Sequence, residues 1–456
     1  MPSSRLAGAL LFVAVAALLA GPDPVLAVPG VEDRLQELER QVAELRAAVA
    51  RARDGGTDRE ELERRIDLLA AEIEKLKLGE AAVEADGRRF GLGPAASKIY
   101  RKTSGASLAG YGELLYQNFD GSRDDGTPSG RTDEIDLLRG ILYVGYRWND
   151  RWLFNSELEV EHAQAGDGAE GEVALEFAYV ERQIRPAINA RAGLLLVPMG
   201  LVNELHEPTV FLGARRPRIE TAILPTTWRE NGAGVFGDLG PVSYRGYVLA
   251  GLDAARFSAA GLRGGRQHGS KSQAEDLAWV ARADWSATPG LLVGGSFYRG
   301  DSGQGIEAGD GRRLAVGTTI FEGHVEWRWR GLELRGLACE ARLGGVTALN
   351  DALSLVGPQS IGKRQRGSYV QAGYDVMPHL GGEGALILYL RAESYDTQHD
   401  VPSGFTSDPA NDVEVVTLGL AWKPLDQVVV KLDFEDADSG AGTGVDQFNA
   451  ALGYVF

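Results

Sequence analysis

Hydrophobic and polar residues alternate along most of this chain with the period of a β-strand. From residue 106 to the C-terminus, apolar and polar side chains alternate in runs of ten to sixteen residues, as expected of strands with one apolar and one polar face. In the run that includes 321–329, Val325 and Trp327 share one face, and His324 and Glu326 share the other. Sixteen such runs can be marked: 106–118, 134–147, 152–163, 172–183, 189–198, 228–238, 242–254, 276–286, 290–300, 314–329, 332–343, 366–376, 384–396, 412–422, 427–437 and 445–456.

The connections between these runs favour a membrane barrel over a soluble β-sandwich, although both alternate in this way. Short connections with turn residues, such as Asn149-Asp150 and Pro289-Gly290, alternate with long ones. Outer-membrane barrels have this arrangement because their periplasmic turns are tight and their outer loops are long. The prediction is an all-β protein whose residues 106–456 form a 16-stranded antiparallel transmembrane β-barrel in the outer membrane. An even strand number returns both ends of the barrel to the periplasm.

Residues 28–80 follow the period of a short α-helical coiled coil. Apolar residues recur at intervals of four and three in two stretches, on either side of 54–58, which is the a/d pattern of a left-handed coiled coil. Each stretch is short, so the helices need partners, either as a hairpin or by association of several subunits. The segment is expected in the periplasm, as an oligomerisation stalk or a spacer. Its a/d positions are Val31, Leu35, Leu38, Val42, Leu45, Val49, Leu62, Ile66, Leu69, Ile73 and Leu76.

A signal peptide and a linker are predicted on either side of this coiled coil. Arg5 precedes an apolar run from Leu6 to Ala20, and the small residues of a cleavage site end at Ala27. Residues 1–27 are therefore predicted to be a secretory signal peptide; the apolar run is short for a membrane span. Residues 81–105 lose the periodicity and gain Gly, Pro and Ser, which predicts a linker.

Composition and charge narrow the possible functions. The 456-residue chain has a formal net charge of −17, so no nucleic acid is expected as a partner, because that needs a basic surface. The single cysteine, Cys339, excludes an internal disulfide and a cysteine-cluster metal site. The six histidines are not at metal-ligand spacing, and no nucleophile with a neighbouring base is evident. We therefore expect no enzyme activity, no cofactor and no metal ion.

Aromatic residues mark the strand ends and the C-terminus. Trp148 and Trp422 lie beside short connections, where an aromatic girdle is expected. The chain ends at Phe456, with Tyr454 on the same face of the last run. The sequence as a whole resembles the phosphate-selective porin O and P family, including dicarboxylate-type porins with an N-terminal coiled coil. The resemblance rests on the terminal Phe456, the signal peptide, the coiled coil, the sixteen runs and the stretches 216–220 and 224–232.

The resemblance covers roughly residues 90–456 and implies a homotrimeric diffusion channel in a Gram-negative outer membrane. It implies that Phe456 and Tyr454 belong to the signal read by the barrel-assembly machinery. It also implies that the third long connection, 199–227, folds into the lumen and narrows it. Outer-membrane lipid and lipopolysaccharide are the expected surroundings.

The composition of 199–227 independently fits burial inside a barrel, because the segment is rich in apolar residues. Arginine forks onto carboxylates and phosphates, so Arg215, Arg216 and Arg218 suit an anion-reading constriction. The alternative is that they pair with wall acids such as Glu157, Glu159, Glu161, Glu172 and Glu176. The other polar residues expected at the constriction are Glu204, His206 and Glu207, and those expected on the lumen wall are Arg139, Glu157, Glu159, Glu176, Glu322, His324, Glu326 and Arg391.

The sequence therefore favours a passive porin without catalysis. Small hydrophilic solutes would cross a water-filled lumen, with selectivity for anions, phosphate or dicarboxylate-like, set at 199–227. One alternative is a structural protein that tethers the outer membrane to the cell wall, with peptidoglycan as a partner of its coiled coil. Another alternative is an outer-membrane enzyme.

Overall fold

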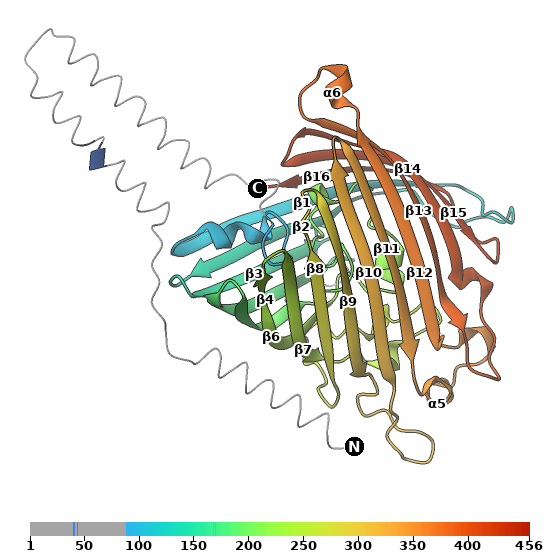
Figure 1. Cartoon of the computed structure of the whole chain (residues 1–456). Coiled ribbons are helices and arrows are strands. Elements are labelled where there is room, and N and C mark those ends of the chain that lie inside the picture. Colours follow the sequence, from blue (N-terminus) through green and yellow to red (C-terminus); the bar gives the residue numbers. More distant parts are fainter. Residues whose placement is uncertain (1–39, 42, 44–87, 167, 169) are drawn as a thin grey trace, which may run out of the picture.

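The computed structural model describes residues 40, 41, 43, 88–166, 168 and 170–456, and it forms a closed barrel of sixteen antiparallel strands (Figure 1). The predicted all-β fold with a sixteen-stranded antiparallel barrel is confirmed. The predicted signal peptide, and the predicted coiled coil apart from three helical residues, lie outside the described residues. The strands are β1 Gly105–Phe119, β2 Glu134–Arg147, β3 Trp152–Glu161, β4 Val173–Arg185, β5 Ile188–Leu196, β6 Arg229–Leu239, β7 Val242–Ala250, β8 Leu277–Trp285, β9 Leu291–Asp301, β10 Gly317–Trp329, β11 Leu332–Leu343, β12 Arg364–Asp375, β13 Ala385–Asp400, β14 Asp412–Leu425, β15 Val428–Ser439 and β16 Gln447–Val455.

Strands that follow one another in the chain pair with one another, and the barrel closes between its first and last strands. Tyr111 of β1 lies opposite Val455 of β16. The strand bounds match the predicted runs to within a few residues. The longest extension is at β13, which continues to Asp400 because that residue still pairs with Arg364 of β12.

Short and long connections lie at opposite ends of the barrel. In Figure 1, α6 (Met377–Leu380) marks the end with short turns, and α5 (Val346–Ala352) marks the end with long loops. Among the described residues, no helix combines the length and apolar character needed to cross a membrane. The other short helices are η1 Ala96–Arg101, η2 Pro208–Val210, α4 Ile219–Ala222, η3 Ala254–Arg256, η4 Arg263–Gly265, η5 Gly357–Gln359 and η6 Pro409–Asn411.

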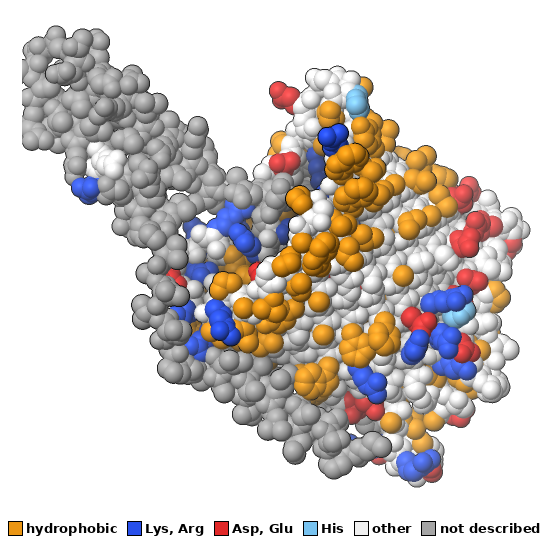
Figure 2. Space-filling model, in the orientation of Figure 1, with side chains coloured by type: hydrophobic (Ala, Val, Ile, Leu, Met, Phe, Trp, Pro, Cys, Tyr) orange, Lys and Arg blue, Asp and Glu red, His pale blue; other side chains and the backbone are white. Residues whose placement is uncertain are grey.

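The strands turn apolar side chains outward and polar ones inward. Leu390 of β13 and Leu418 of β14 are 51% and 63% exposed, whereas the adjacent Arg391 and Thr417 are 1% and 0% exposed. Figure 2 shows hydrophobic side chains spread over the outer face of the strands in view. This inversion of a soluble protein fits a barrel surrounded by lipid. Exposed tryptophans beside short turns are Trp148, Trp285, Trp329 and Trp422.

Residues 88–101 enter the barrel and pack against its inner wall. Leu92 and Ile99 are each 1% exposed, and η1 contacts β1, β2 and β3. The ring centroid of Phe90 lies 5.1 Å from that of Tyr100 and 4.9 Å from that of Phe236 in β6. The sequence predicts a linker at 81–105, but in the described part of that range these apolar side chains anchor the chain inside the lumen. We call residues 88–101 the N-terminal segment.

The inner wall differs from one side of the barrel to the other. On β1 to β4 it carries a row of aromatic rings, in which the centroids of Tyr111 and Tyr143 are 6.1 Å apart and those of Tyr143 and Phe177 are 5.9 Å apart. On β11 to β15, which we call the charged side of the lumen, it carries the charged side chains that contact residues 209–219. These are Arg335, Arg391, Glu393, Lys423, Lys431, Asp433 and Glu435.

Candidate channel constriction

The connection between β5 and β6 crosses the lumen. We call residues 197–228 the constriction loop. Asn203 closes its base, because its side-chain amide donates to the carbonyls of Val197 at 2.6 Å and Trp228 at 2.9 Å. Farther along, the Glu220 carboxylate accepts hydrogen bonds from the Val202 amide at 2.8 Å and from the Tyr369 hydroxyl of β12 at 2.9 Å. The loop therefore spans from its own strands to the opposite wall, as the family resemblance implies.

Three polar residues early in the loop were expected at the constriction, and the structure buries all of them. Glu204 is paired with Arg245 of β7 at 3.4 Å. Glu207 accepts hydrogen bonds at 3.0 Å from the backbone amides of Ala95 and Ala96 in the N-terminal segment. Burial raises the pKa of Glu207 to about 7, although these two amides lower it. Glu207 thus joins the N-terminal segment to the loop and does not face an open passage.

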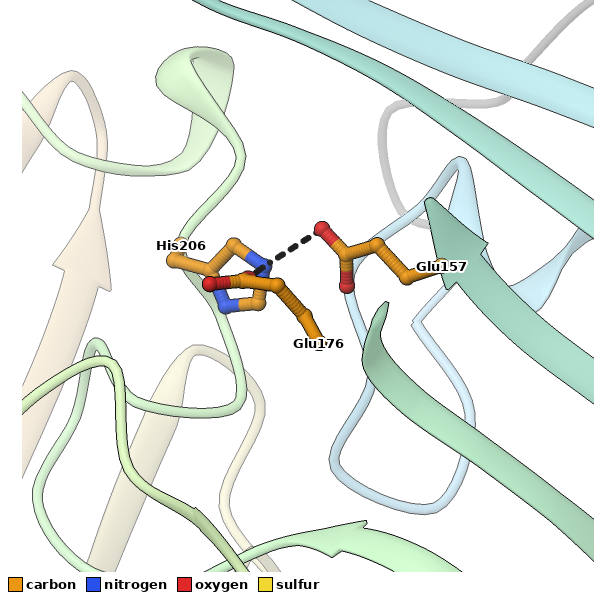
Figure 3. Close-up of side chains that lie close together, drawn as sticks. All are labelled: Glu157, Glu176 and His206. Atoms are coloured by element: carbon orange, nitrogen blue, oxygen red, sulfur yellow. Dashed lines mark hydrogen bonds and ion pairs between the residues drawn. The ribbon is translucent and has the colours of Figure 1, made fainter. Parts of the chain in front are cut away.

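His206 is the third of these residues and lies between two wall carboxylates (Figure 3). Its Nε2 atom is 3.0 Å from Glu157 of β3 and 3.3 Å from Glu176 of β4. Its Nδ1 atom is 2.9 Å from the carbonyl oxygen of Asn203. Burial lowers the pKa of His206, but the two carboxylates outweigh that effect and raise it. Arg229 also contacts Glu176, at 3.2 Å.

The later part of the loop is held by its backbone. Four cationic side chains of β11, β13, β14 and β15 donate hydrogen bonds to consecutive or nearby carbonyl oxygens between residues 209 and 215. Such bonds fix the path of the loop without requiring particular loop side chains. The pairs are Lys423 with Thr209 at 2.8 Å, Arg335 with Val210 at 2.7 Å, Lys431 with Gly213 at 2.9 Å and Arg391 with Arg215 at 3.5 Å.

The three loop arginines do not form one cluster. Arg218 pairs with Glu435 of β15 at 2.8 Å, and Arg215 lines the same cavity as Arg218. Arg216 instead donates to the Thr227 hydroxyl at 2.9 Å, and its Nη2 atom is buried without a hydrogen-bond partner. Pairing of these arginines with acids of β3 and β4 is therefore not what the structure shows.

The expected lumen-wall residues all face inward and are buried, and each contacts a charged or titratable side chain. Because these charges are largely compensated locally, the wall residues contribute less free charge than their number indicates. The pairs are Arg139 with Glu113 at 3.5 Å and Glu159 at 4.0 Å, His324 with Glu322 at 2.7 Å and Asp284 at 2.9 Å, Glu326 with Arg335 at 3.0 Å, and Arg391 with Glu393 at 2.8 Å.

Cavities lie on both sides of residues 209–218. At the long-loop end, a cavity of about 510 Å³ is lined by Arg123, Arg131, Arg215 and Arg218 together with the ends of β1, β14, β15 and β16. At the short-turn end, a cavity of about 190 Å³ is lined by loop residues 209, 210 and 212, with wall residues of β10, β11 and β14. The loop therefore separates two cavities on the charged side of the lumen.

The loop between β7 and β8, residues 251–276, covers the constriction loop from the long-loop end. Arg266 donates hydrogen bonds to the carbonyls of Pro225 at 3.3 Å and Thr227 at 2.5 Å. Burial and the neighbouring arginines, Arg266 first among them, lower the pKa of His268 to about 4. The imidazole of His268 is therefore neutral at neutral pH, beside a group of positive charges.

No family model matches the sequence. An uncharacterized protein of Aquifex aeolicus (strain VF5) is 37% identical over 391 residues, which cover 84% of this chain and 87% of that protein. The chain belongs to the same family as that protein. The relative has no recorded function, so membership of the family assigns none.

Solved structures with the same fold come from outer membranes. OmpF of Salmonella typhi, in complex with daunomycin, has a TM-score of 0.53 at 12% identity, over 78% of this chain and 99% of that chain. A loop L8 deletion mutant of OmpT, an outer membrane protein of Vibrio cholerae, has a TM-score of 0.50 at 11% identity, over 78% of this chain and 100% of that chain. At these identities the likeness establishes the barrel fold alone.

Some features of the site have no signal in the sequence. The carbonyl oxygens that Lys423 and Lys431 contact are present in every residue, so no residue type marks them. The N-terminal segment has apolar anchors, Leu92 and Ile99, but no period that would have separated it from a linker. The group of Glu157, Glu176 and His206 combines residues 49 and 30 positions apart in sequence, so their spacing gave no indication of a shared site.

Proposed function

We propose that this protein is a passive diffusion channel of the outer membrane for small hydrophilic solutes. The observation that carries the proposal is the position of residues 209–218, between two cavities on the charged side of a closed sixteen-stranded barrel. Barrels of this strand number leave room for an aqueous channel, and the apolar outer face fits a bilayer. The long loops would then be extracellular and the short turns periplasmic.

We propose further that the channel prefers anions. Four arginines line the long-loop cavity, and the guanidinium group of Arg215 makes no ion pair with any described carboxylate. Below them, Lys431 and Lys423 donate hydrogen bonds to backbone carbonyls, which carry no net negative charge. A passage with these fixed positive charges attracts small anions, and phosphate or dicarboxylates are the candidates that the family resemblance adds.

A homotrimer is part of the same proposal and rests on that resemblance. The alternative function, a tether to the cell wall, depends on residues 28–80, nearly all of which lie outside the described part of the chain. Tyr454 of β16 and Phe456, the residue after that strand, are 41% and 50% exposed, which leaves them accessible for the proposed reading by the assembly machinery.

Ion conductance in planar bilayers tests the channel, and the reversal potential under a salt gradient tests its preference. Wild-type protein should conduct and favour anions. Arg215→Ala with Arg218→Ala should shift the reversal potential toward cation preference, because screening is least complete where the water-filled section is small. The matched control is Arg312→Ala with Arg313→Ala, two exposed arginines of loop 302–316, which should change little. Absence of conductance contradicts the channel, and equal shifts in both pairs contradict the anion site.

A further inference from the structure

The group formed by Glu157, Glu176 and His206 has the composition of a metal-ion site. Its three side chains come from β3, β4 and the constriction loop, and Figure 3 shows them converging on one point. All three are buried, with exposures of 0%, 1% and 2%. One atom of each, a carboxylate oxygen or a ring nitrogen, lies within 4.8 Å of the other two.

The hydrogen atoms of His206 can be assigned from its neighbours. The carbonyl oxygen of Asn203 accepts hydrogen bonds and cannot donate them, so Nδ1 must carry a hydrogen. The Nε2 atom then points its lone pair, or a second hydrogen, at two carboxylates at once. A histidine that donates through one nitrogen to a backbone carbonyl and presents the other to acidic groups is arranged as metal-binding histidines are.

Two further observations point to a ligand between these groups. The Glu157 Oε2 atom is buried and has no hydrogen-bond partner, which is costly for a carboxylate oxygen. The Nε2 atom is 3.0 Å from one carboxylate and 3.3 Å from the other. Ligands at about 2.0–2.1 Å from a tetrahedral zinc ion are roughly 3.3 Å apart, so these two contacts already have about the spacing of two ligands on one zinc ion.

We propose that Glu157, Glu176 and His206 bind one divalent metal ion of the zinc type, with a nitrogen and carboxylate oxygens as ligands. Arg229 contacts the other oxygen of Glu176 at 3.2 Å and orients that carboxylate from the outer shell. The ion fastens the constriction loop to β3 and β4. This site is independent of the proposed channel function, since it requires neither conductance nor anion preference.

His324 provides a matched control within the same barrel. It too lies between two carboxylates, but each ring nitrogen meets a different one: Nδ1 is 2.7 Å from Glu322 and Nε2 is 2.9 Å from Asp284. The guanidinium group of Arg282 is 3.1 Å from the same Nε2 atom, and a cation there excludes a metal ion. His324 therefore has the same types of neighbour as His206, but its ion pairs hold it in a different geometry.

Zinc titration of the full-length protein tests the proposal. The protein is purified in detergent, freed of any affinity tag and of metal by a chelator, and titrated with Zn²⁺ alone in a calorimeter, with metal content measured in parallel. The wild type and the His324→Ala control should bind about one Zn²⁺ per chain. Glu157→Gln and His206→Ala should weaken binding by more than about 100-fold, because loss of an outer-shell partner alone costs about 10–100-fold.

Two results would overturn the site: no stoichiometric Zn²⁺ in the wild type, or equal binding by the wild type and His206→Ala. Should the substituted proteins fail to fold, the zinc-edge X-ray absorption spectrum of the wild type decides the matter. One nitrogen with oxygen donors at about 2.0–2.1 Å supports the site. Oxygen donors without nitrogen mean that zinc is bound elsewhere and contradict it.

Discussion

The two sides of the lumen hold the constriction loop in opposite ways. On the β3–β4 side, wall carboxylates bind a loop side chain, with His206 between Glu157 and Glu176. On the β11–β15 side, wall cations bind the loop backbone, as Lys431 does at the carbonyl of Gly213. The first arrangement depends on the identity of a single loop residue, whereas the second accepts nearly any residue in the loop.

The difference also determines where net charge remains. A divalent metal ion between two carboxylates neutralises them, as does an imidazolium together with Arg229, which contacts Glu176, so the β3–β4 side presents little free charge. A carbonyl oxygen is only a dipole and leaves the cation that binds it charged. The contacts of Lys423 and Lys431 with the loop add no negative charge, and the side chains of Arg215 and Arg218 line the cavity, Arg218 while paired with Glu435. The proposed anion path therefore runs along the side of the lumen where the constriction loop is held through its backbone.

The largest expected effect is on the β3–β4 side of the lumen, from His206→Ala. The change leaves Glu157 and Glu176 buried and facing each other, and removal of one partner from a buried ionic group costs about 3–5 kcal/mol. The constriction loop should become accessible to protease and to hydrogen exchange near Asn203. His324→Ala is the control and should cost less, because Asp284 keeps its contacts with Arg245 and Arg282. Equal losses would show that the loop does not depend on this contact.

A smaller effect is expected on the β11–β15 side of the lumen, from Lys431→Met. The substitution removes the hydrogen bond to Gly213 and a cation–π contact with Phe211, whose ring centroid is 3.6 Å from the ammonium group. A hydrogen bond to a charged group contributes about 1.5–3 kcal/mol. Anion preference, measured as a reversal potential, should fall, whereas Lys431→Arg should preserve it. Lys271→Met, at an exposed position, is the control, and a shift of the same size there would contradict the comparison.

A still smaller effect is expected where the loop meets the N-terminal segment, from Glu207→Gln. Above the pKa of Glu207, about 7, the carboxylate is charged, and the amide keeps its shape but replaces charge-assisted hydrogen bonds to Ala95 and Ala96 with neutral ones, at a cost of roughly 1 kcal/mol. Hydrogen exchange of these two amides should accelerate by about fivefold, which is that free energy expressed as a rate ratio. Unchanged exchange would mean that Leu92 and Ile99 hold the segment without this contact.

The smallest effect is expected outside the lumen, from Arg313→Ala. Arg313 pairs with Glu275 at 2.7 Å, but the two side chains are 60% and 47% exposed, and such pairs contribute about 0–1 kcal/mol. Thermal unfolding of the barrel and its ion preference should both be unchanged within error. A clear loss of stability would show that the outer loops contribute as much as the lumen contacts do.

Local pattern was sufficient to predict the barrel but not the partners inside it. Strict alternation places Glu326 inward and Trp327 outward, because a strand turns successive side chains to opposite faces, and the structure agrees. Likewise the apolar content of 199–227 was enough to predict burial of that loop. These properties depend only on neighbours in sequence.

Contacts across the lumen depend on the path of the loop and the stagger of the strands, which no local pattern encodes. The acids Glu157 and Glu176 were candidate partners for the loop arginines, yet they meet His206 and Arg229 instead. Arg218 finds its carboxylate on β15, 217 residues away. The residue types of the site could therefore be predicted, but the pairing could not.

The docked N-terminal segment has a mechanical consequence. β1 begins at Gly105, and its pairing with β16 begins at Tyr111; hydrogen bonds in such a ladder can be peeled apart one at a time from an end. A pulling force that arrives along the chain from upstream of residue 88 meets the packed side chains of Phe90, Leu92 and Ile99 first. The load is thereby shared among the interior walls of β1, β2, β3 and β6, and the seam between β1 and β16 carries less of the tension.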